Sequence, residues 1–137
     1  MLPTETDVLI VGAGPTGLAL AAALLKAGVT PLVVEAAEEG QHTSRAAVIH
    51  AHTLEMLDTI SAAGPLEARG IRLPRFTVRD RDQALFSIGF ENLPSAFRHL
   101  LMAPQWTTET VLETRVMQLG GRLHRGVTVL GAAPDGA

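Results

Sequence analysis

A glycine-rich turn between two apolar stretches constrains the fold of this chain more than any other feature. The apolar run Val8–Val11 leads directly into Gly12-Ala13-Gly14-Pro15-Thr16-Gly17, and an alanine- and leucine-rich stretch follows. A second apolar run, Leu32–Val34, ends in Glu35. Strand, G-x-G-x-x-G turn, helix, strand and terminal acid, in this order, are typical of a βαβ unit that binds a dinucleotide.

Each residue of this pattern has its own physical reason. Gly12 allows the tight turn after the strand, Gly14 lets the backbone approach a pyrophosphate, and Gly17 lets the helix pack closely on the sheet. The helix N-terminus offers free N–H groups and the positive end of its dipole to the phosphates. Glu35 stands where a carboxylate accepts hydrogen bonds from ribose hydroxyls and repels a 2′-phosphate. The pattern therefore favours FAD or NAD over NADP.

A membrane segment is the alternative interpretation of the same stretch. No charged residue occurs from Val8 to Leu25, a length that just reaches the roughly 18 apolar residues of a spanning helix. However, Glu5 and Asp7 precede it, where a signal peptide carries Lys or Arg. The Gly-Pro-Thr-Gly turn also breaks the run in its middle. We therefore expect no membrane association.

Composition excludes several classes of function. The chain has 137 residues, which is room for one domain, and a net charge of −3, so no positive field attracts nucleic acid. It has no cysteine, which excludes disulfides, thiolate metal sites and a cysteine nucleophile and fits a cytoplasmic protein. Apolar residues make up 47% and aromatic residues only 4%, so we expect an aliphatic core.

Periodicity and turn residues predict further elements along the chain. A Gly-Pro pair at residues 64–65 is expected to end the second helix, with a helical turn at 66–69 after it. Thr107 is the expected N-cap of the third helix, with Glu109 in its first turn. The predicted strands cover 7–11, 31–35 and 122–124, and the predicted helices cover 15–27, 50–63 and 107–119.

The middle of the chain has a different pattern. Arg75–Arg79 and Ala84–Phe90 predict an antiparallel hairpin with a turn at Asp80-Arg81-Asp82. A short strand is expected at His99–Met102, and another extended piece begins at Val127–Leu130. The expected fold is α/β and Rossmann-like, with an incomplete parallel sheet and a small antiparallel β insertion. Only three parallel strands are predicted, whereas a doubly wound sheet usually has about five or six.

Four segments carry a resemblance to a known family: Asp7–Leu18, Glu35, Ser44-Arg45-Ala46 leading to His52–Glu55, and Pro104-Gln105. Together they resemble the N-terminal part of the FAD-dependent aromatic hydroxylases. These are the class A flavoprotein monooxygenases similar to p-hydroxybenzoate hydroxylase, in particular their polyketide and phenol branch. The resemblance implies FAD as cofactor, with NAD(P)H and O₂ as co-substrates for hydroxylation of an aromatic small molecule.

The resemblance also implies roles for particular residues. Glu35 would bind the adenosine ribose, Arg45 the FAD phosphate or ribityl region, and Gln105 the ribityl chain or the flavin edge. Backbone near Val129 would lie beside the adenine, and residues 75–102 would begin the substrate-side sheet. No residue is assigned as catalytic, because the flavin carries the chemistry. The turn residues that would hold the pyrophosphate are Gly12, Gly14, Pro15, Thr16 and Gly17.

Departures from the family leave alternatives open. Two later motifs of these hydroxylases, one with Asp-Gly and one with Gly-Asp, have no counterpart, so residues 1–137 are expected to be an N-terminal FAD-binding fragment. The alternatives are a truncated non-catalytic chain, or half of a split flavoprotein that self-associates or binds a complementing C-terminal chain. A small NAD-binding dehydrogenase domain is a third. His50 and His52 have no third ligand at metal spacing, so no metal is expected. Trp106 is expected to be a packing residue.

Overall fold

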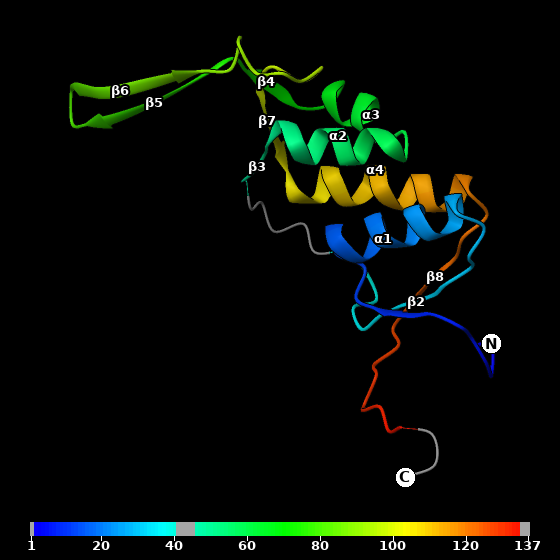
Figure 1. The fold of residues 1–137 in the computed structure, drawn as a ribbon. Coiled ribbons are helices and arrows are strands. Elements are labelled where there is room, and N and C mark those ends of the chain that lie inside the picture. The colour runs from blue at the N-terminus through cyan, green and yellow to red at the C-terminus, as the bar shows by residue number, and fades with distance from the viewer. Residues whose placement is uncertain (1, 41–45, 135–137) are drawn as a thin grey trace.

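The computed structural model describes residues 2–40 and 46–134, with the side chains of residues 46 and 47 left out. Figure 1 shows a layer of helices between a parallel sheet and a second sheet, with a hairpin that projects away from both. The twelve elements of the described residues are β1 (Leu9–Val11), α1 (Pro15–Lys26), β2 (Leu32–Glu35), β3 (Ala46–Ile49), α2 (Ala51–Thr59), α3 (Ala63–Glu67), β4 (Ile71–Leu73), β5 (Arg75–Asp80), β6 (Gln83–Gly89), β7 (Leu100–Pro104), α4 (Gln105–Gln118) and β8 (Leu123–Arg125).

The parallel sheet contains three strands in the order β1-β2-β8. Val11 of β1 is level with Val34 of β2, and Glu35 of β2 is level with Arg125 of β8. The predicted βαβ unit and the third parallel strand near residues 122–124 are thus confirmed. Residues 127–130, which are expected to begin an extended piece, form no strand.

The second sheet is antiparallel, in the order β3-β7-β4. Its central strand β7 confirms the strand expected near residues 99–102. Strands β3 and β4 were not predicted from the sequence. Each is only three or four residues long, too short for an alternating pattern, and each is held by pairing with β7.

The core lies between the helix layer and the two sheets. Helix α1 packs against α4, and α2 and α3 lie next to α4 (Figure 1). The fully buried large side chains are aliphatic, as expected from the composition: Leu18, Leu54, Leu66, Leu101, Leu112, Val33, Val34 and Val116. Helix α4 contributes an apolar stripe that includes the buried residues Val111, Leu112 and Val116.

The second predicted helix is divided in two. Helix α2 ends at Thr59, and Ser61 follows with a φ of 60°. The Gly64-Pro65 pair lies inside α3 instead of ending a helix. Pro65 is tolerated there because the N–H groups of a first helical turn have no intrahelical acceptor.

The start of α4 also differs from the prediction. The helix begins at Gln105, with Pro104 at the N-cap position. Thr107 is therefore no cap but a buried helical residue, 5% exposed, and Glu109 lies beyond the first turn. Trp106, which is expected to be a packing residue, is 43% exposed and lies outside the buried core.

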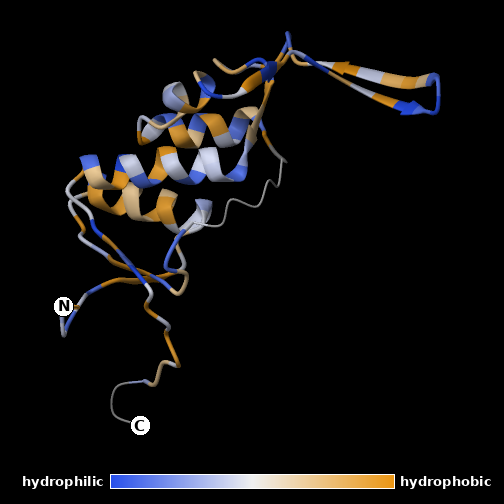
Figure 2. Cartoon of the chain, turned by 180° about the vertical axis from the view of Figure 1, so that it is seen from behind, coloured by the Kyte–Doolittle hydropathy of each residue, from blue (hydrophilic) through white to orange (hydrophobic). Residues whose placement is uncertain are grey.

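Strands β5 and β6 form the predicted hairpin. Arg81 in the turn has a φ of 51°, and the pairing is irregular between Val78 and Arg79. Phe76 pairs with Ile88, and Val78 pairs with Phe86, so one face of the ribbon carries the large apolar side chains. Figure 2 shows hydrophobic residues on both arms and hydrophilic residues at the tip.

Helix length bears on the membrane alternative. Among the described residues no helix is both long and apolar enough to cross a bilayer. The apolar stretch after the glycine turn forms α1, which has 12 residues and packs against α4.

Candidate cofactor site

The carboxyl edge of the parallel sheet holds the glycine-rich turn. Gly12 donates its N–H to the carbonyl of Val34 at 2.8 Å, which ties the turn to β2. Its φ of 103° lies in the left-handed region, where a side chain is strained. The helical ladder of α1 begins when Leu18 donates to the Gly14 carbonyl at 3.0 Å. The amides before Leu18 are therefore at the open end of the helix.

Gly14 and Gly17 differ in what a side chain would meet at each position. A Cβ on Gly17 would lie 2.1 Å from the carbonyl oxygen of Gly12, so only glycine lets the turn close over the helix. A Cβ on Gly14 would meet nothing within 4 Å, and its φ of −73° suits any residue. The protein itself thus makes no demand for glycine at position 14. A ligand that approaches the backbone there would make that demand.

Glu35 holds the turn as well as marking the end of β2. Its Oε2 accepts a hydrogen bond from the N–H of Ala13 at 2.7 Å, and its Oε1 accepts one from Ala37 at 2.9 Å. These two bonds lower the pKa of the Glu35 carboxyl against the opposing effect of burial, and the charge of Arg125 lowers it further. Each carboxylate oxygen has further lone pairs, so Glu35 can also accept ribose hydroxyls.

Arg125 extends this cluster across the sheet. It lies level with Glu35 at the end of β8, and its Nη2 is 2.7 Å from Oε2 of Glu113 on α4. Beyond it, Val127 donates its N–H to the Glu35 carbonyl at 2.9 Å. Sequence reasoning missed Arg125 and Glu113. Arg125 stands at the carboxyl end of a predicted parallel strand, next to the predicted range 122–124, and that position is the signal that could have found it.

Two cavities adjoin the glycine turn. One, of about 490 Å³, follows the free edge of β1 and is lined by β1, Leu20 and the turn. The other, of about 400 Å³, is lined by Pro15 and Thr16 of the turn together with Gln105 and Thr108 of α4. Gln105 donates its Nε2–H to Oε1 of Glu109 at 2.8 Å. The fold thus brings Gln105 and the glycine turn to one cavity.

Of the remaining predicted residues, Val129 is not brought to these cavities. Arg45 lies outside the described residues. Val129 follows β8 in irregular structure and is 37% exposed. Within 2–40 and 46–134, no group of three or more candidate ligands is placed to hold a metal ion. The side chain of His99 is only 14% exposed, and its Nε2 lies 2.9 Å from Oε1 of Glu67.

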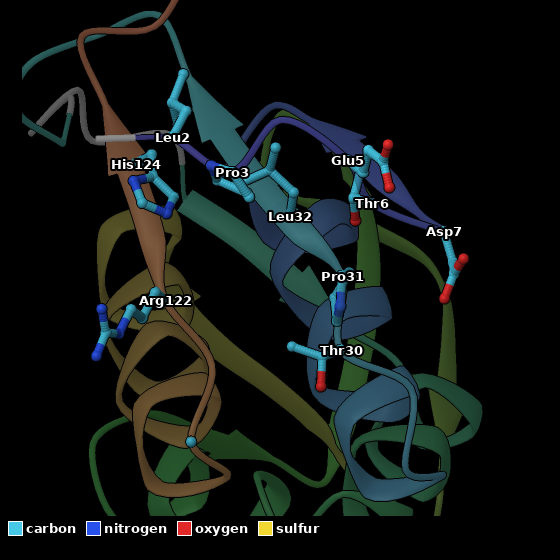
Figure 3. Close-up of a pocket in the computed structure, with 11 residues that line it drawn as sticks. Leu2, Pro3, Glu5, Thr6, Asp7, Thr30, Pro31, Leu32, Arg122 and His124 are labelled. Atoms are coloured by element: carbon cyan, nitrogen blue, oxygen red, sulfur yellow. The ribbon is translucent and has the colours of Figure 1, made fainter.

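A third cavity, larger than the two at the glycine turn, lies at the opposite edge of the sheet. It measures about 660 Å³ and is lined by residues that precede or begin the parallel strands. Figure 3 shows Glu5 and Asp7 on one side and Arg122 and His124 on the other. None of the predicted site residues lines it. Ligands of open α/β sheets bind at the carboxyl edge, so the cavities at the glycine turn are the candidate site.

Comparison with known proteins identifies the family of this chain. Residues 5–137 match the family model described as "FAD binding domain". The chain belongs to this family. Its cofactor is therefore FAD, and the expected resemblance to the FAD-dependent aromatic hydroxylases is confirmed. We call residues 12–17 the glycine cradle. It has open space at Gly14 and no room for a side chain at Gly17, and it therefore fits a dinucleotide pyrophosphate.

Individual relatives agree with this assignment. The chain is 39% identical to 6-methylpretetramide 4-monooxygenase from Streptomyces rimosus over 98% of its own length and 25% of the relative's. It is 36% identical to the solved anhydrotetracycline hydroxylase of Streptomyces rimosus, with a TM-score of 0.76 over 88% of this chain and 24% of that one. The fold alone is shared with p-nitrophenol 4-monooxygenase of Pseudomonas putida, at 23% identity, a TM-score of 0.84, and coverage of 91% and 33%. The chain spans about a quarter of the length of the curated relatives it matches.

Proposed function

We propose that this chain is the FAD-binding part of a monooxygenase that hydroxylates a phenol or an aromatic polyketide with NAD(P)H and O₂. The observation that carries the proposal is the glycine cradle itself. Gly17 has no room for a side chain and Gly14 has open space, and Glu35 ties the cradle to the end of β2. The substrate class rests on relatives that are named for 6-methylpretetramide and anhydrotetracycline.

In this proposal FAD supplies the redox and oxygen chemistry, and the residues of this chain hold it. Gly12, Gly14, Pro15, Thr16 and Gly17 receive the pyrophosphate against the open end of α1. Glu35 accepts the ribose hydroxyls of the adenosine. Gln105, at the second cavity, contacts the ribityl chain or the flavin edge. Arg45 and the backbone near Val129 complete the proposed set, and residues 75–102 begin the substrate-side sheet. The proposed compartment is the cytoplasm.

Retention of flavin by the purified chain tests the proposal. After incubation with FAD and desalting, we expect about one flavin per chain by absorbance. Gly14→Ala is the decisive variant, because its Cβ meets no protein atom but occupies the space of the pyrophosphate. We expect it to keep the thermal midpoint of the wild type and to bind FAD at least about tenfold more weakly. Equal FAD binding by wild type and G14A contradicts the proposed cradle, and preferred binding of NADH over FAD favours the dehydrogenase alternative.

A specific observation favours a second candidate, half of a split flavoprotein. Strand β1 is an edge of its sheet, and Leu9 and Val11 are 47% and 60% exposed. An uncovered apolar edge strand is a template for pairing with another chain. If the chain retains FAD only together with a C-terminal polypeptide of a homologous hydroxylase, the split flavoprotein is favoured over a chain that binds FAD by itself. If the chain instead pairs with a second copy of itself through β1, the experiment shows self-association.

A further inference from the structure

Glu109 fixes which way the amide of Gln105 faces. The two residues are one turn apart on α4, and the Gln105 Nε2 lies 2.8 Å from Oε1 of Glu109. An ionised carboxylate only accepts hydrogen bonds, so the NH₂ group of the amide must face Glu109. The amide oxygen of Gln105 is then directed away from Glu109 and remains available as an acceptor.

Gln105 stands in a wall that is otherwise mostly apolar. The cavity of about 400 Å³ is lined on its apolar side by Ala19, Ile49, Met56, Leu57 and Leu112. Its polar lining comes from Thr16, Thr53, Gln105 and Thr108. A few polar groups in an apolar cavity decide how a ligand is oriented, so the direction of the Gln105 amide matters to any ligand held here.

A second observation in the same wall points to a ligand. Thr108 is 6% exposed, and its Oγ1 has no hydrogen-bond partner within the part of the chain that the structure describes. A buried hydroxyl without a partner costs free energy. Thr108 lines the same cavity as Gln105, so a polar group of a ligand held there is a candidate partner for its hydroxyl.

We propose that Glu109 is a positioning residue that presents the Gln105 oxygen to a hydroxyl of the FAD ribityl chain, with the Thr108 hydroxyl as a second polar contact. The assignment rests on the proposed function. The assignment extends the proposed function by adding Glu109 and Thr108 to the site. It also names the ligand group that is bound, a donor hydroxyl of a polyol. A merely structural Gln105–Glu109 pair would stabilise the helix slightly and would not change the affinity for a ligand.

Comparison of FAD with ADP separates the two roles. ADP carries the adenosine and pyrophosphate but no ribityl chain or flavin. We expect Glu109→Ala to weaken FAD binding by about tenfold and to leave ADP binding within about twofold of wild type. Glu109→Gln keeps an acceptor oxygen of the same reach, so it should recover most of the FAD affinity. Thr108→Val, nearly the same shape without a donor, should weaken FAD alone.

Glu55→Gln is the matched control. Glu55 is a helix carboxylate whose side chain is 42% exposed, within 3.6 Å of His52, and it lines none of the cavities at the turn. This variant should bind both ligands as wild type does. Circular dichroism and the thermal midpoint of each variant show whether a loss of affinity is only a loss of folding.

The outcomes are distinct. Equal weakening of FAD and ADP by Glu109→Ala, or no weakening of either, overturns the role of Glu109 while the proposed function stands. Failure of the wild type to bind FAD or ADP overturns the proposed function.

The side-chain amide of Gln105 gives a ligand-free readout by nuclear magnetic resonance. The proton bonded to Glu109 should resonate further downfield from its partner in the wild type than in Glu109→Ala, and an unchanged separation of the two protons overturns the hydrogen bond on which the inference depends.

Discussion

At the scale of single residues, two glycines and one carboxylate set the geometry of the cradle. The fold requires glycine at position 17, since a Cβ there would lie 2.1 Å from the Gly12 carbonyl oxygen. A Cβ at position 14 would meet no atom within 4 Å. Glu35 uses both oxygens on backbone N–H groups, one of them in the turn. The consequences for stability and for binding can therefore be separated residue by residue.

Gly17→Ala should destabilise the fold. The clash is with backbone, which cannot move without opening the turn, so we expect a loss of about 2–3 kcal/mol in the free energy of unfolding. Urea denaturation followed by circular dichroism measures it. The paired variant Gly14→Ala should be neutral, or more stable by about 0.5 kcal/mol through the unfolded chain. Equal stability of the two variants would contradict the packing described for Gly17.

Glu35 should make the turn sensitive to acid. Its pKa is lower in the folded protein than in the unfolded chain, chiefly through the Ala13 and Ala37 hydrogen bonds. Its contribution to stability is therefore complete above the unfolded value near 4.5 and is lost as pH falls through the lower folded value. Between pH 6 and 8 this contribution should be constant. Glu35→Gln should be less stable at neutral pH and should show a smaller loss between about pH 5 and pH 3, measured by thermal unfolding at each pH.

At the scale of elements, the hairpin behaves differently from the rest of the chain. Among the described strands, β5 and β6 pair with each other and with no third strand, and every residue of β6 is exposed. Figure 1 shows the hairpin projecting beyond the helix layer. A two-stranded ribbon without a covered face is marginally stable in water, so its apolar face requires a covering partner to become rigid.

Amide hydrogen exchange should reveal this difference. We expect the amides of β5 and β6 to exchange within the shortest labelling times, while those of β2 and α4, which carry buried side chains, are protected. Mass spectrometry of peptides from the labelled chain measures both. Protection of the hairpin that rises with protein concentration would show that a second molecule covers it, and protection at low concentration would contradict the description of a free ribbon.

At the scale of the whole molecule, the parallel sheet is open. Among the described strands the order is β1-β2-β8, which leaves β1 at an edge with Leu9 and Val11 exposed. The cavity of about 490 Å³ along this edge reaches the glycine turn. The same surface thus adjoins both the cofactor site and any strand that pairs with β1.

Leu9→Lys tests this edge. Lysine on an edge strand opposes strand addition, and Leu9 is 47% exposed, so the fold should tolerate it. We expect the chain to associate with rising concentration and the variant to associate less, in sedimentation velocity. FAD binding per chain should stay unchanged unless pairing completes the site. Wild-type chain that is monomeric at all concentrations would contradict association through this edge.

The sequence by itself determined the parts of this protein that depend on local chemistry. The turn from Gly12 to Gly17, the strand that ends in Glu35 and the aliphatic stripe of α4 follow from backbone freedom, charge and periodicity along a few consecutive residues. Tertiary structure decided the rest, because it depends on contacts between distant segments. Strands β3 and β4 exist only because β7 pairs with them. Gln105 lines the same cavity as the glycine turn only because α1 packs against α4. Arg125 lies level with Glu35 and contacts Glu113 only because β8 pairs with β2.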